Sequence, residues 1–192
     1  MMVSSRYLNS SIRITNIKLS CSINSKFNKD FSSFNHNRYI ISKQTSSFFV
    51  IRCLKYTFVL IIFYKGHINI TGIRHWKDIG CAYTIASYFA KLIHGKVVRR
   101  CIDNISASYY LHKSCKQLLL PQFCQYLENE KYYTSVRYNL DKFAGAFFKS
   151  KHGTIVLFST YSCYTVGAKT IHALNTLYKH LVIQLLNFHL NV

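Results

Sequence analysis

Apolar and polar residues alternate along two separate segments of the chain, which is the pattern of half-buried β-strands. The first segment runs from Ile12 to Ser22 (IRITNIKLSCS) and the second from Val97 to Tyr110 (VVRRCIDNISASYY). Each contains the dipeptide Asn-Ile, and each is followed by a polar or helix-capable stretch and then by an apolar hairpin. The two strands therefore open two similar structural units.

A fixed spacing links the landmarks of the two copies. After each hairpin comes a short strand that ends in glycine. A phenylalanine of the hairpin precedes that glycine by nine residues in both copies: Phe63 before Gly72 and Phe158 before Gly167. A shared order at a shared spacing indicates an internal repeat.

Each repeat ends in a long amphipathic pattern. Apolar residues recur at three- and four-residue steps from Ile79 to Ile93 and from Ile171 to Phe188, which predicts one helix against one side of a sheet in each repeat. Gly95 is placed to end the first of these helices. These limits divide the chain into a short N-terminal tail, a first repeat and a second repeat: residues 1–11, 12–95 and 96–192.

Strand periodicity predicts which side chains share the face turned away from the helices, here called the open face. Ile17, Leu19 and Cys21 alternate onto the helix side. The open face of the first repeat then holds Ile14, Asn16, Lys18, Ser20, Val59, Ile61, Phe63, His67, Asn69 and Thr71, and that of the second holds Ile102, Asn104, Ser106, Thr154, Val156, Phe158, Ser162, Tyr164 and Val166. Because this face is almost uncharged and partly apolar, we expect a partner to cover it.

The chain is strongly basic, with 25 Lys and Arg against 6 Asp and Glu among 192 residues, a net charge of +19 and a pI near 9.8. The folded surface therefore carries a positive field that favours a polyanionic partner, either nucleic acid or an anionic membrane. An AT-rich genome also inflates lysine content without any functional cause. The longest apolar stretch, Phe58–Tyr64, is far shorter than the roughly 20 residues that cross a bilayer, so we expect no membrane span.

The amino-acid composition gives little support for a catalytic site or a metal site. Six acids leave few carboxylates for paired acid and base catalysis or for a hard-metal site. The seven cysteines include no C-x-x-C pair, which favours reduced thiols and no zinc site. We expect no cofactor and no enzyme activity, although sequence alone leaves a nucleophile with a histidine and acid partner open.

Three strings, each set behind an Asn-Ile strand, resemble the core of the TATA-box-binding protein (TBP) family. They are VLIIFYKGHINITGIR (Val59–Arg74), RYNLDKFAGAFFK (Arg137–Lys149) and TIVLFSTYSCYTVGAK (Thr154–Lys169). The resemblance covers about residues 12–190 in the order of the family. It implies an α+β, TBP-like saddle of two pseudosymmetric repeats, with a curved ten-stranded antiparallel sheet and four helices on its convex side.

The resemblance also implies that the concave sheet face binds and bends AT-rich double-stranded DNA through the minor groove, where the family inserts apolar side chains. The residues that match the family's DNA contacts fall into four kinds. Amide contacts match Asn16 and Asn104, inserted rings match Phe63, Phe143 and Phe158, groove contacts match Thr71, Ile61 and Val156, and phosphate contacts match Arg52, Arg74, Lys149 and Lys169.

Several positions depart from the family pattern. An ungapped reading puts Ser46 where the fourth inserted ring belongs, and Phe48 reaches that place only with a shift. Val166 replaces the second threonine. In the turn that matches the family's partner-binding loop, Asp141 keeps an acid but Lys142 replaces an apolar residue. These departures indicate a divergent protein from a viral or AT-rich parasite lineage.

The sequence thus predicts a non-enzymatic transcription initiation factor in the nucleus, or at a viral transcription site, with basal transcription factors and the RNA polymerase machinery as partners. One alternative keeps the fold but makes it a protein-interaction module of a transcription complex, with weak or lost DNA binding. A second alternative is an enzyme that uses a related sheet as a ligand pocket.

Overall fold

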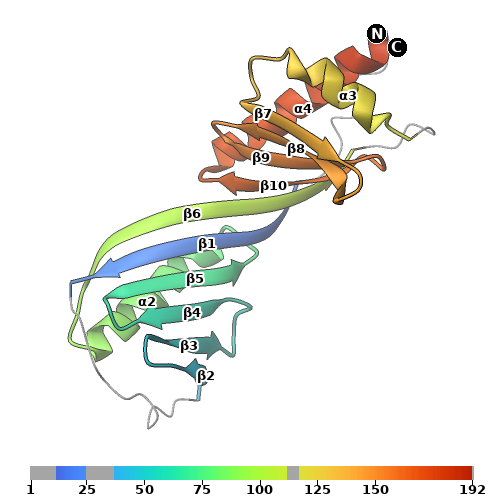
Figure 1. The fold of residues 1–192 in the computed structure, drawn as a ribbon. Helices are drawn as coiled ribbons and strands as arrows, with labels where there is room; N and C mark the ends of the chain where they lie inside the picture. The colour runs from blue at the N-terminus through green and yellow to red at the C-terminus, as the bar shows by residue number, and fades with distance from the viewer. Residues whose placement is uncertain (1–11, 25–36, 112–116, 192) are drawn as a thin grey trace. The chain divides into compact units, whose positions relative to one another are not determined.

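The computed structural model of the chain describes residues 12–24, 37–111 and 117–191 (Figure 1). The predicted tail, residues 1–11, lies outside these ranges. The chain divides into two compact units, which we call the N-unit (Thr15–Asn104) and the C-unit (Met1–Ile14 with Ile105–Val192). The division falls inside a strand, nine residues after the predicted repeat boundary at residue 95.

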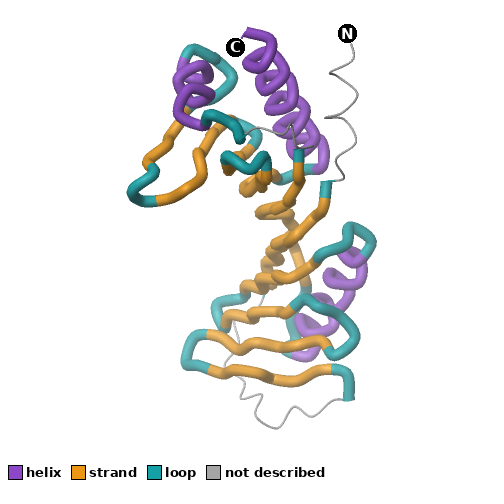
Figure 2. The backbone as a smooth tube through the Cα atoms, turned by 90° about the vertical axis from the view of Figure 1, so that its right-hand side faces the viewer, coloured by secondary structure: helices purple, strands orange, loops and turns teal. Residues whose placement is uncertain are grey.

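The N-unit is a sheet with a helix on one face. Its elements are β1 (Arg13–Ile23), β2 (Tyr39–Gln44), β3 (Phe48–Cys53), β4 (Val59–Phe63), β5 (His67–Ile73) and α2 (Asp78–Leu92). The strands hydrogen-bond in the order β2-β3-β4-β5-β1. Figure 2 shows α2 beside one face of these strands. Ala82 and Ala86 on α2 are fully buried, because small side chains let the helix approach the sheet closely.

The C-unit repeats this plan in mirrored strand order. The strand β6 (Val97–Tyr110) is shared, because its residues up to Asn104 belong to the N-unit and those from Ile105 belong to the C-unit. The other elements of the C-unit are α3 (Leu120–Glu128), β7 (Ser135–Asn139), β8 (Phe143–Ser150), β9 (Gly153–Phe158), β10 (Ser162–Ala168) and α4 (Ile171–Asn191). The strand order is β6-β10-β9-β8-β7. The helices and sheet enclose a core in which Phe123 of α3 meets Phe148 of β8 edge to face, with ring centroids 5.9 Å apart.

The expected fold class, an α+β fold with ten antiparallel strands in two repeats, is confirmed. The resemblance implied four helices, and three lie within the described residues. The helix-capable stretch of the first repeat includes residues 25–36, which lie outside them. None of the described helices combines the length and apolarity that crossing a bilayer requires.

Strand alternation follows the prediction in most of the sheet but fails in β6. Arg100 reaches α2, donating from Nη2 to Ser87 Oγ at 3.3 Å, so even-numbered residues there face the helix. Ile105 is nevertheless fully buried in the C-unit, which means that odd-numbered residues face the helices beyond it. The alternation shifts between residues 103 and 105 because one strand supplies side chains to two cores. Ile102, predicted on the open face, therefore alternates with Arg100 onto the helix side.

Candidate nucleic-acid interface

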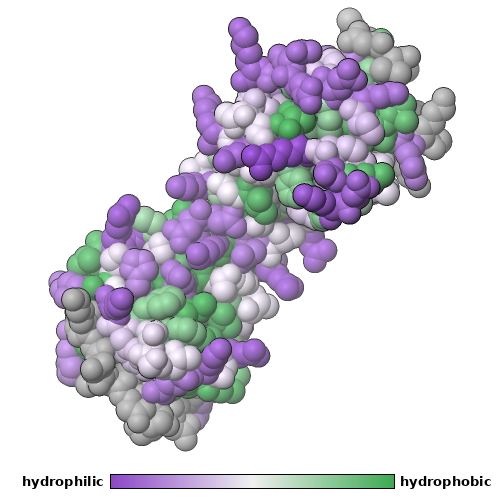
Figure 3. Space-filling model, in the orientation of Figure 1, coloured by the Kyte–Doolittle hydropathy of each residue, from purple (hydrophilic) through white to green (hydrophobic). Residues whose placement is uncertain are grey.

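Backbone pairing arranges the open face of each unit in three rows of side chains that run across the strands. The rows of the N-unit are Arg52, Val59, Thr71; then Val50, Ile61, Asn69, Ser20; then Phe48, Phe63, His67, Ser22. The corresponding rows of the C-unit are Lys149, Thr154, Val166; then Phe147, Val156, Tyr164, Ser108; then Gly145, Phe158, Ser162, Tyr110. Figure 3 shows apolar patches between hydrophilic side chains in both units.

Each unit carries an aromatic pair that includes a phenylalanine of its third row, and the two pairs have nearly the same ring separation. The ring centroids of Phe48 and Phe63 are 5.5 Å apart, and those of Phe143 and Phe158 are 5.6 Å apart. Three of these four rings were predicted site residues. Phe48, which the sequence offered only with a shift, completes the set.

The two pairs are built differently. Phe48 lies directly opposite Phe63, whereas the residue opposite Phe158 is Gly145 and the ring comes from Phe143, two residues earlier. A Cβ atom on Gly145 would lie 2.7 Å from Cε1 of Phe143 and 3.0 Å from Cε1 of Phe158. The missing side chain of Gly145 therefore makes room for the Phe143 ring. Ser46 occupies the position equivalent to Phe143, as the ungapped reading has it, and Phe48 supplies the ring instead.

The C-unit carries two further aromatic side chains on its open face. Phe147 and Tyr164 are 38% and 39% exposed, and their rings lie 5.1 Å from Phe143 and 5.5 Å from Phe158. Sequence reasoning missed Phe147, although its alternation with Phe143 along β8 places it on this face. Val156, a predicted groove contact, sits between Phe147 and Tyr164 in its row and is only 4% exposed. It therefore forms the floor beneath these rings, while its N-unit counterpart Ile61 stays partly exposed.

Asn16 is held in a defined orientation. The backbone N–H of Gly72 donates to Asn16 Oδ1 at 2.8 Å, and Thr71 Oγ1 donates to the same oxygen at 3.4 Å. Since the amide oxygen is engaged within the protein, the Nδ2 group provides the donors on the open side. Gly72 has φ +91°, a conformation that favours glycine. The structure thus brings together Asn16 and Thr71, two predicted site residues.

The second repeat has an asparagine but no threonine at the positions that match Asn16 and Thr71. Asn104 is half-buried on β6. Val166 replaces the threonine and is 40% exposed, so its row presents a methyl surface where Thr71 presents a hydroxyl group.

The four predicted phosphate contacts occupy equivalent places in the two units. Arg52 and Lys149 each begin the first row of their unit. Arg74 directly follows β5, and Lys169 directly follows the equivalent strand β10. All four are exposed. This symmetry frames each open face with two cations.

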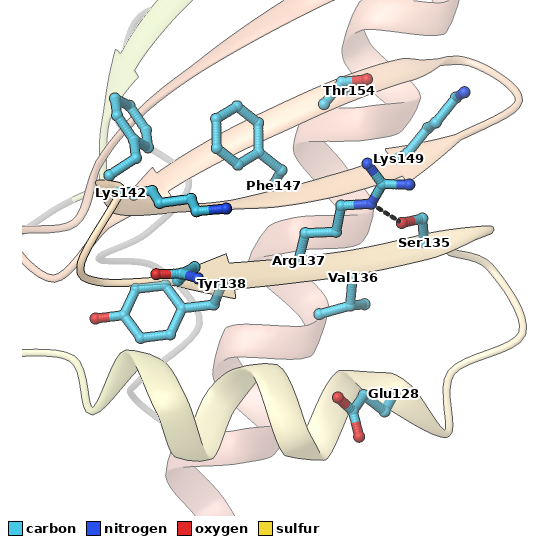
Figure 4. A pocket seen from close by; sticks show the side chains of 12 residues that line it. Glu128, Ser135, Val136, Arg137, Tyr138, Lys142, Phe147, Lys149 and Thr154 are labelled. Carbon is cyan, nitrogen blue, oxygen red and sulfur yellow. Dashed lines mark hydrogen bonds between the residues drawn. The ribbon is translucent and has the colours of Figure 1, made fainter.

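Additional cations surround the aromatic rings. Lys43 Nζ lies 5.9 Å from the centroid of the Phe48 ring. In the C-unit, a cavity of about 640 Å³ is lined by Phe143 and Phe147 together with the cations Arg137, Lys142 and Lys149 (Figure 4). Arg137 lies opposite Phe147 on β7 and donates from Nε to Ser135 Oγ at 3.2 Å. Sequence reasoning missed Arg137 as part of this surface.

One acid breaks the expectation of an almost uncharged open face. Asp103 Oδ1 accepts a hydrogen bond from Ser20 Oγ at 2.8 Å, and Asp103 Oδ2 lies 3.9 Å from Lys18 Nζ. Ser20 lies opposite Asn69 in the second row, so Asp103 belongs to the open face of the N-unit. The alternation shift in β6 placed it there.

The predicted partner-binding residues lie in the turn between β7 and β8. Asp141 and Lys142 are both exposed, and the Lys142 N–H donates to the Asn139 carbonyl at 3.2 Å. Beside them, Leu140 is 66% exposed. The turn presents an acid, a base and an apolar side chain to solvent.

The described residues contain no cluster of three or more His, Cys, Asp or Glu that could hold a metal ion. Burial raises the pKa of the Cys21 and Cys53 thiols to about 11 and that of Cys124 to about 12, the last helped by the charge of Glu128. These thiols are protonated at neutral pH and are poor nucleophiles.

No protein-family model and no curated protein matches this sequence. Among solved structures, the chain is similar to one titled Methanococcus jannaschii TBP, with a TM-score of 0.64 and 16% sequence identity over 91% of this chain and 97% of that chain. At this identity the likeness shows a TBP-like fold.

Proposed function

We propose that this protein is a TBP-like, non-enzymatic transcription initiation factor that binds AT-rich double-stranded DNA through the minor groove and bends it. The observation that carries the proposal is the aromatic pair on the open face of each unit, at 5.5 Å and 5.6 Å ring separation. Phe143 is 39% exposed and the other three rings are partly exposed. Two surface aromatic pairs at equivalent positions of a repeat are what insertion at two base steps requires.

The chemistry of the open face supports a minor-groove partner. A·T pairs present only acceptors in that groove, and the donors of Asn16 Nδ2 are the complement of such acceptors. Apolar residues such as Ile61 and Val59 suit the sugar walls. The framing cations, Arg52, Arg74, Lys149 and Lys169, are placed for phosphates, which position the protein without specifying sequence.

The turn that holds Asp141 and Lys142 is the surface we assign to basal transcription factors and the RNA polymerase machinery. Its exposure and its mixed charge support this assignment. We accordingly place the protein in the nucleus, or at a viral transcription site.

The decisive experiment measures affinity and bending together. Fluorescence anisotropy on an AT-rich duplex should show log affinity falling linearly with log salt, with a slope of about 0.9 for each phosphate contacted. FRET between the duplex ends should report the bend. Phe143→Ala with Phe158→Ala should reduce both affinity and bend.

The matched control is Ile183→Ala with Leu190→Ala. These two exposed apolar side chains lie on α4, away from the open face, and their loss should change neither quantity. Full affinity and full bending in the Phe143 and Phe158 double variant would remove ring insertion from the proposal.

One observation favours the alternative of a protein-interaction module. Phe147, Tyr164 and Val166 leave the open face of the C-unit with three apolar or aromatic side chains near 40% exposure, and such patches are typical of protein interfaces. If the protein neither binds nor bends any duplex, that result would favour a protein as the partner of this face.

A further inference from the structure

Asp103 is the acid whose placement the proposed DNA interface does not explain. Within the described residues, the other acids lie in helices or loops: Asp78, Glu128, Glu130 and Asp141. Asp103 alone among them lies in a strand. In a protein of net charge +19, a carboxylate on the face that meets polyanionic DNA needs a specific reason.

The carboxylate is held in position but retains free acceptor capacity. Ser20 donates to Oδ1 at 2.8 Å, and the Lys18 ammonium lies 3.9 Å from Oδ2. The side chain of Asp103 stays 34% exposed. Because a carboxylate offers about four lone-pair sites, acceptors remain for a group that approaches from the open side.

The surroundings form a small polar hollow. A cavity of about 230 Å³ is lined by Ser20, Ser22, His67, Arg99, Cys101 and Asp103. Ser22 and His67 lie opposite each other in the third row of the N-unit. The hollow is therefore part of the surface that we propose meets the groove.

A carboxylate in the minor groove distinguishes G·C pairs from A·T pairs. A·T pairs offer the acceptors adenine N3 and thymine O2, whereas G·C pairs add the guanine N2 amino group, the one donor in this groove. A carboxylate pressed against acceptors loses water from its remaining lone pairs and gains no donor in return, which is costly. Opposite guanine N2–H the same carboxylate gains a charge-assisted hydrogen bond.

We infer that Asp103 is a specificity-determining residue that accepts a hydrogen bond from guanine N2–H, so that the preferred site is AT-rich with one G·C pair in the minor groove at the position Asp103 faces. This inference rests on the proposed minor-groove function. Lys18 and Ser20 are positioning residues that fix the carboxylate.

The test uses base analogues that change the minor groove alone. In a set of duplexes, each A·T pair of an AT-rich site is replaced in turn by G·C or by inosine·C, which lacks the N2 amino group. The full-length protein should bind one G·C duplex about tenfold more tightly than its inosine·C partner. Replacing adenine by 2,6-diaminopurine at that position, which adds the amino group to an A·T pair, should likewise raise affinity.

Variants assign the effect to Asp103. In Asp103→Ala the ratio between the affinities for G·C and inosine·C should fall to about one. The affinity for the all-A·T duplex should rise, because no carboxylate then faces the acceptors of the groove. Asp78→Asn removes the same charge from α2 in the N-unit and should leave the ratio unchanged.

Different results would contradict the role of Asp103 and the proposed function. If the protein binds AT-rich duplexes but the ratio is one at every position, or persists in Asp103→Ala, the role of Asp103 is overturned and the proposed function stands. If no duplex binds, the proposed function itself is overturned.

Discussion

The N-unit and the C-unit reach the same aromatic spacing by different routes. In the N-unit one ring stands directly across from the other, Phe48 against Phe63. In the C-unit the ring of Phe143 leans over Gly145 to reach Phe158. What the two halves share is the position of the rings and not the position of the residues in the sequence. A repeat can therefore retain a surface while the residues that form it change.

The units also differ in what surrounds the rings. The second row of the C-unit carries Phe147 and Tyr164 where the N-unit has Val50 and Asn69. The N-unit instead carries the Lys18 and Asp103 pair. We expect the C-unit to contribute more apolar contact and the N-unit more hydrogen bonding.

The largest expected effect separates core rings from surface rings. Phe49 and Phe148 are fully buried, so Phe49→Ala or Phe148→Ala should lower the free energy of unfolding by about 3–5 kcal/mol. Each has an immediate neighbour of the same type on the open face, Phe48 and Phe147 respectively. Urea unfolding of Phe48→Ala and Phe147→Ala should show a loss below roughly 1 kcal/mol, because these rings are partly exposed. Equal losses for neighbours would contradict the assigned faces.

The next effect tests which residue supplies the fourth ring. Phe48→Ala should weaken duplex binding by about 1.5–3 kcal/mol, the free energy of burying a phenylalanine side chain, and should reduce the bend seen by FRET. Ser46→Ala should leave both unchanged, because Ser46 contributes no ring. If Ser46→Ala weakened binding and Phe48→Ala did not, the ungapped assignment of this position to Ser46 would stand. The two aromatic pairs would then not be equivalent.

A smaller effect is expected at the glycine that makes room for Phe143. Gly145→Ala should displace the Phe143 and Phe158 rings and weaken duplex binding by about 1 kcal/mol. Gly80→Ala is the matched control, since a Cβ there meets nothing within 4 Å and alanine favours the helix. Unchanged affinity in Gly145→Ala would show that the rings tolerate displacement.

The smallest effect is a difference in pH response. Burial lowers the pKa of His180 in the C-unit, against an opposing contribution from Glu130; the His180 ring stacks on Tyr132 at 3.6 Å and its Nδ1 lies 3.2 Å from the Tyr133 hydroxyl. The unfolded chain therefore binds the proton more tightly. The free energy of unfolding should fall as pH drops through about 6.5 and level off below the pKa of the folded state.

Hydrogen exchange of C-unit amides, corrected for intrinsic rates, should detect this loss between pH 7.5 and 5.5. His180→Gln should reduce the loss, although His189, whose pKa burial also lowers, keeps part of it. A loss of the same size in the variant would assign the pH response to other groups.

Much of the fold was predictable because alternation and repeat spacing are local properties of the sequence. Ile17, Leu19 and Cys21 face the core as expected, and Phe63 and Phe158 occupy equivalent places. The origin of the protein, its cellular location and its DNA contacts stay predictions.

Other features depended on pairing between strands, which sequence periodicity does not fix. Nothing local distinguishes Phe48 from Phe49 until the partner of Phe63 is known. The placement of Asp103 required the shift of alternation in β6, which arises only because that strand serves two cores. Arg137 became part of the C-unit surface through its pairing with Phe147.

That shift in β6 also constrains how the gene can change. One residue inserted into or deleted from β6 would move every following side chain of the strand to the opposite face of the sheet. A change before residue 105 would turn the buried side chains of Ile105, Ala107 and Tyr109 toward solvent. We expect natural length variation to avoid this strand and to collect in the loops.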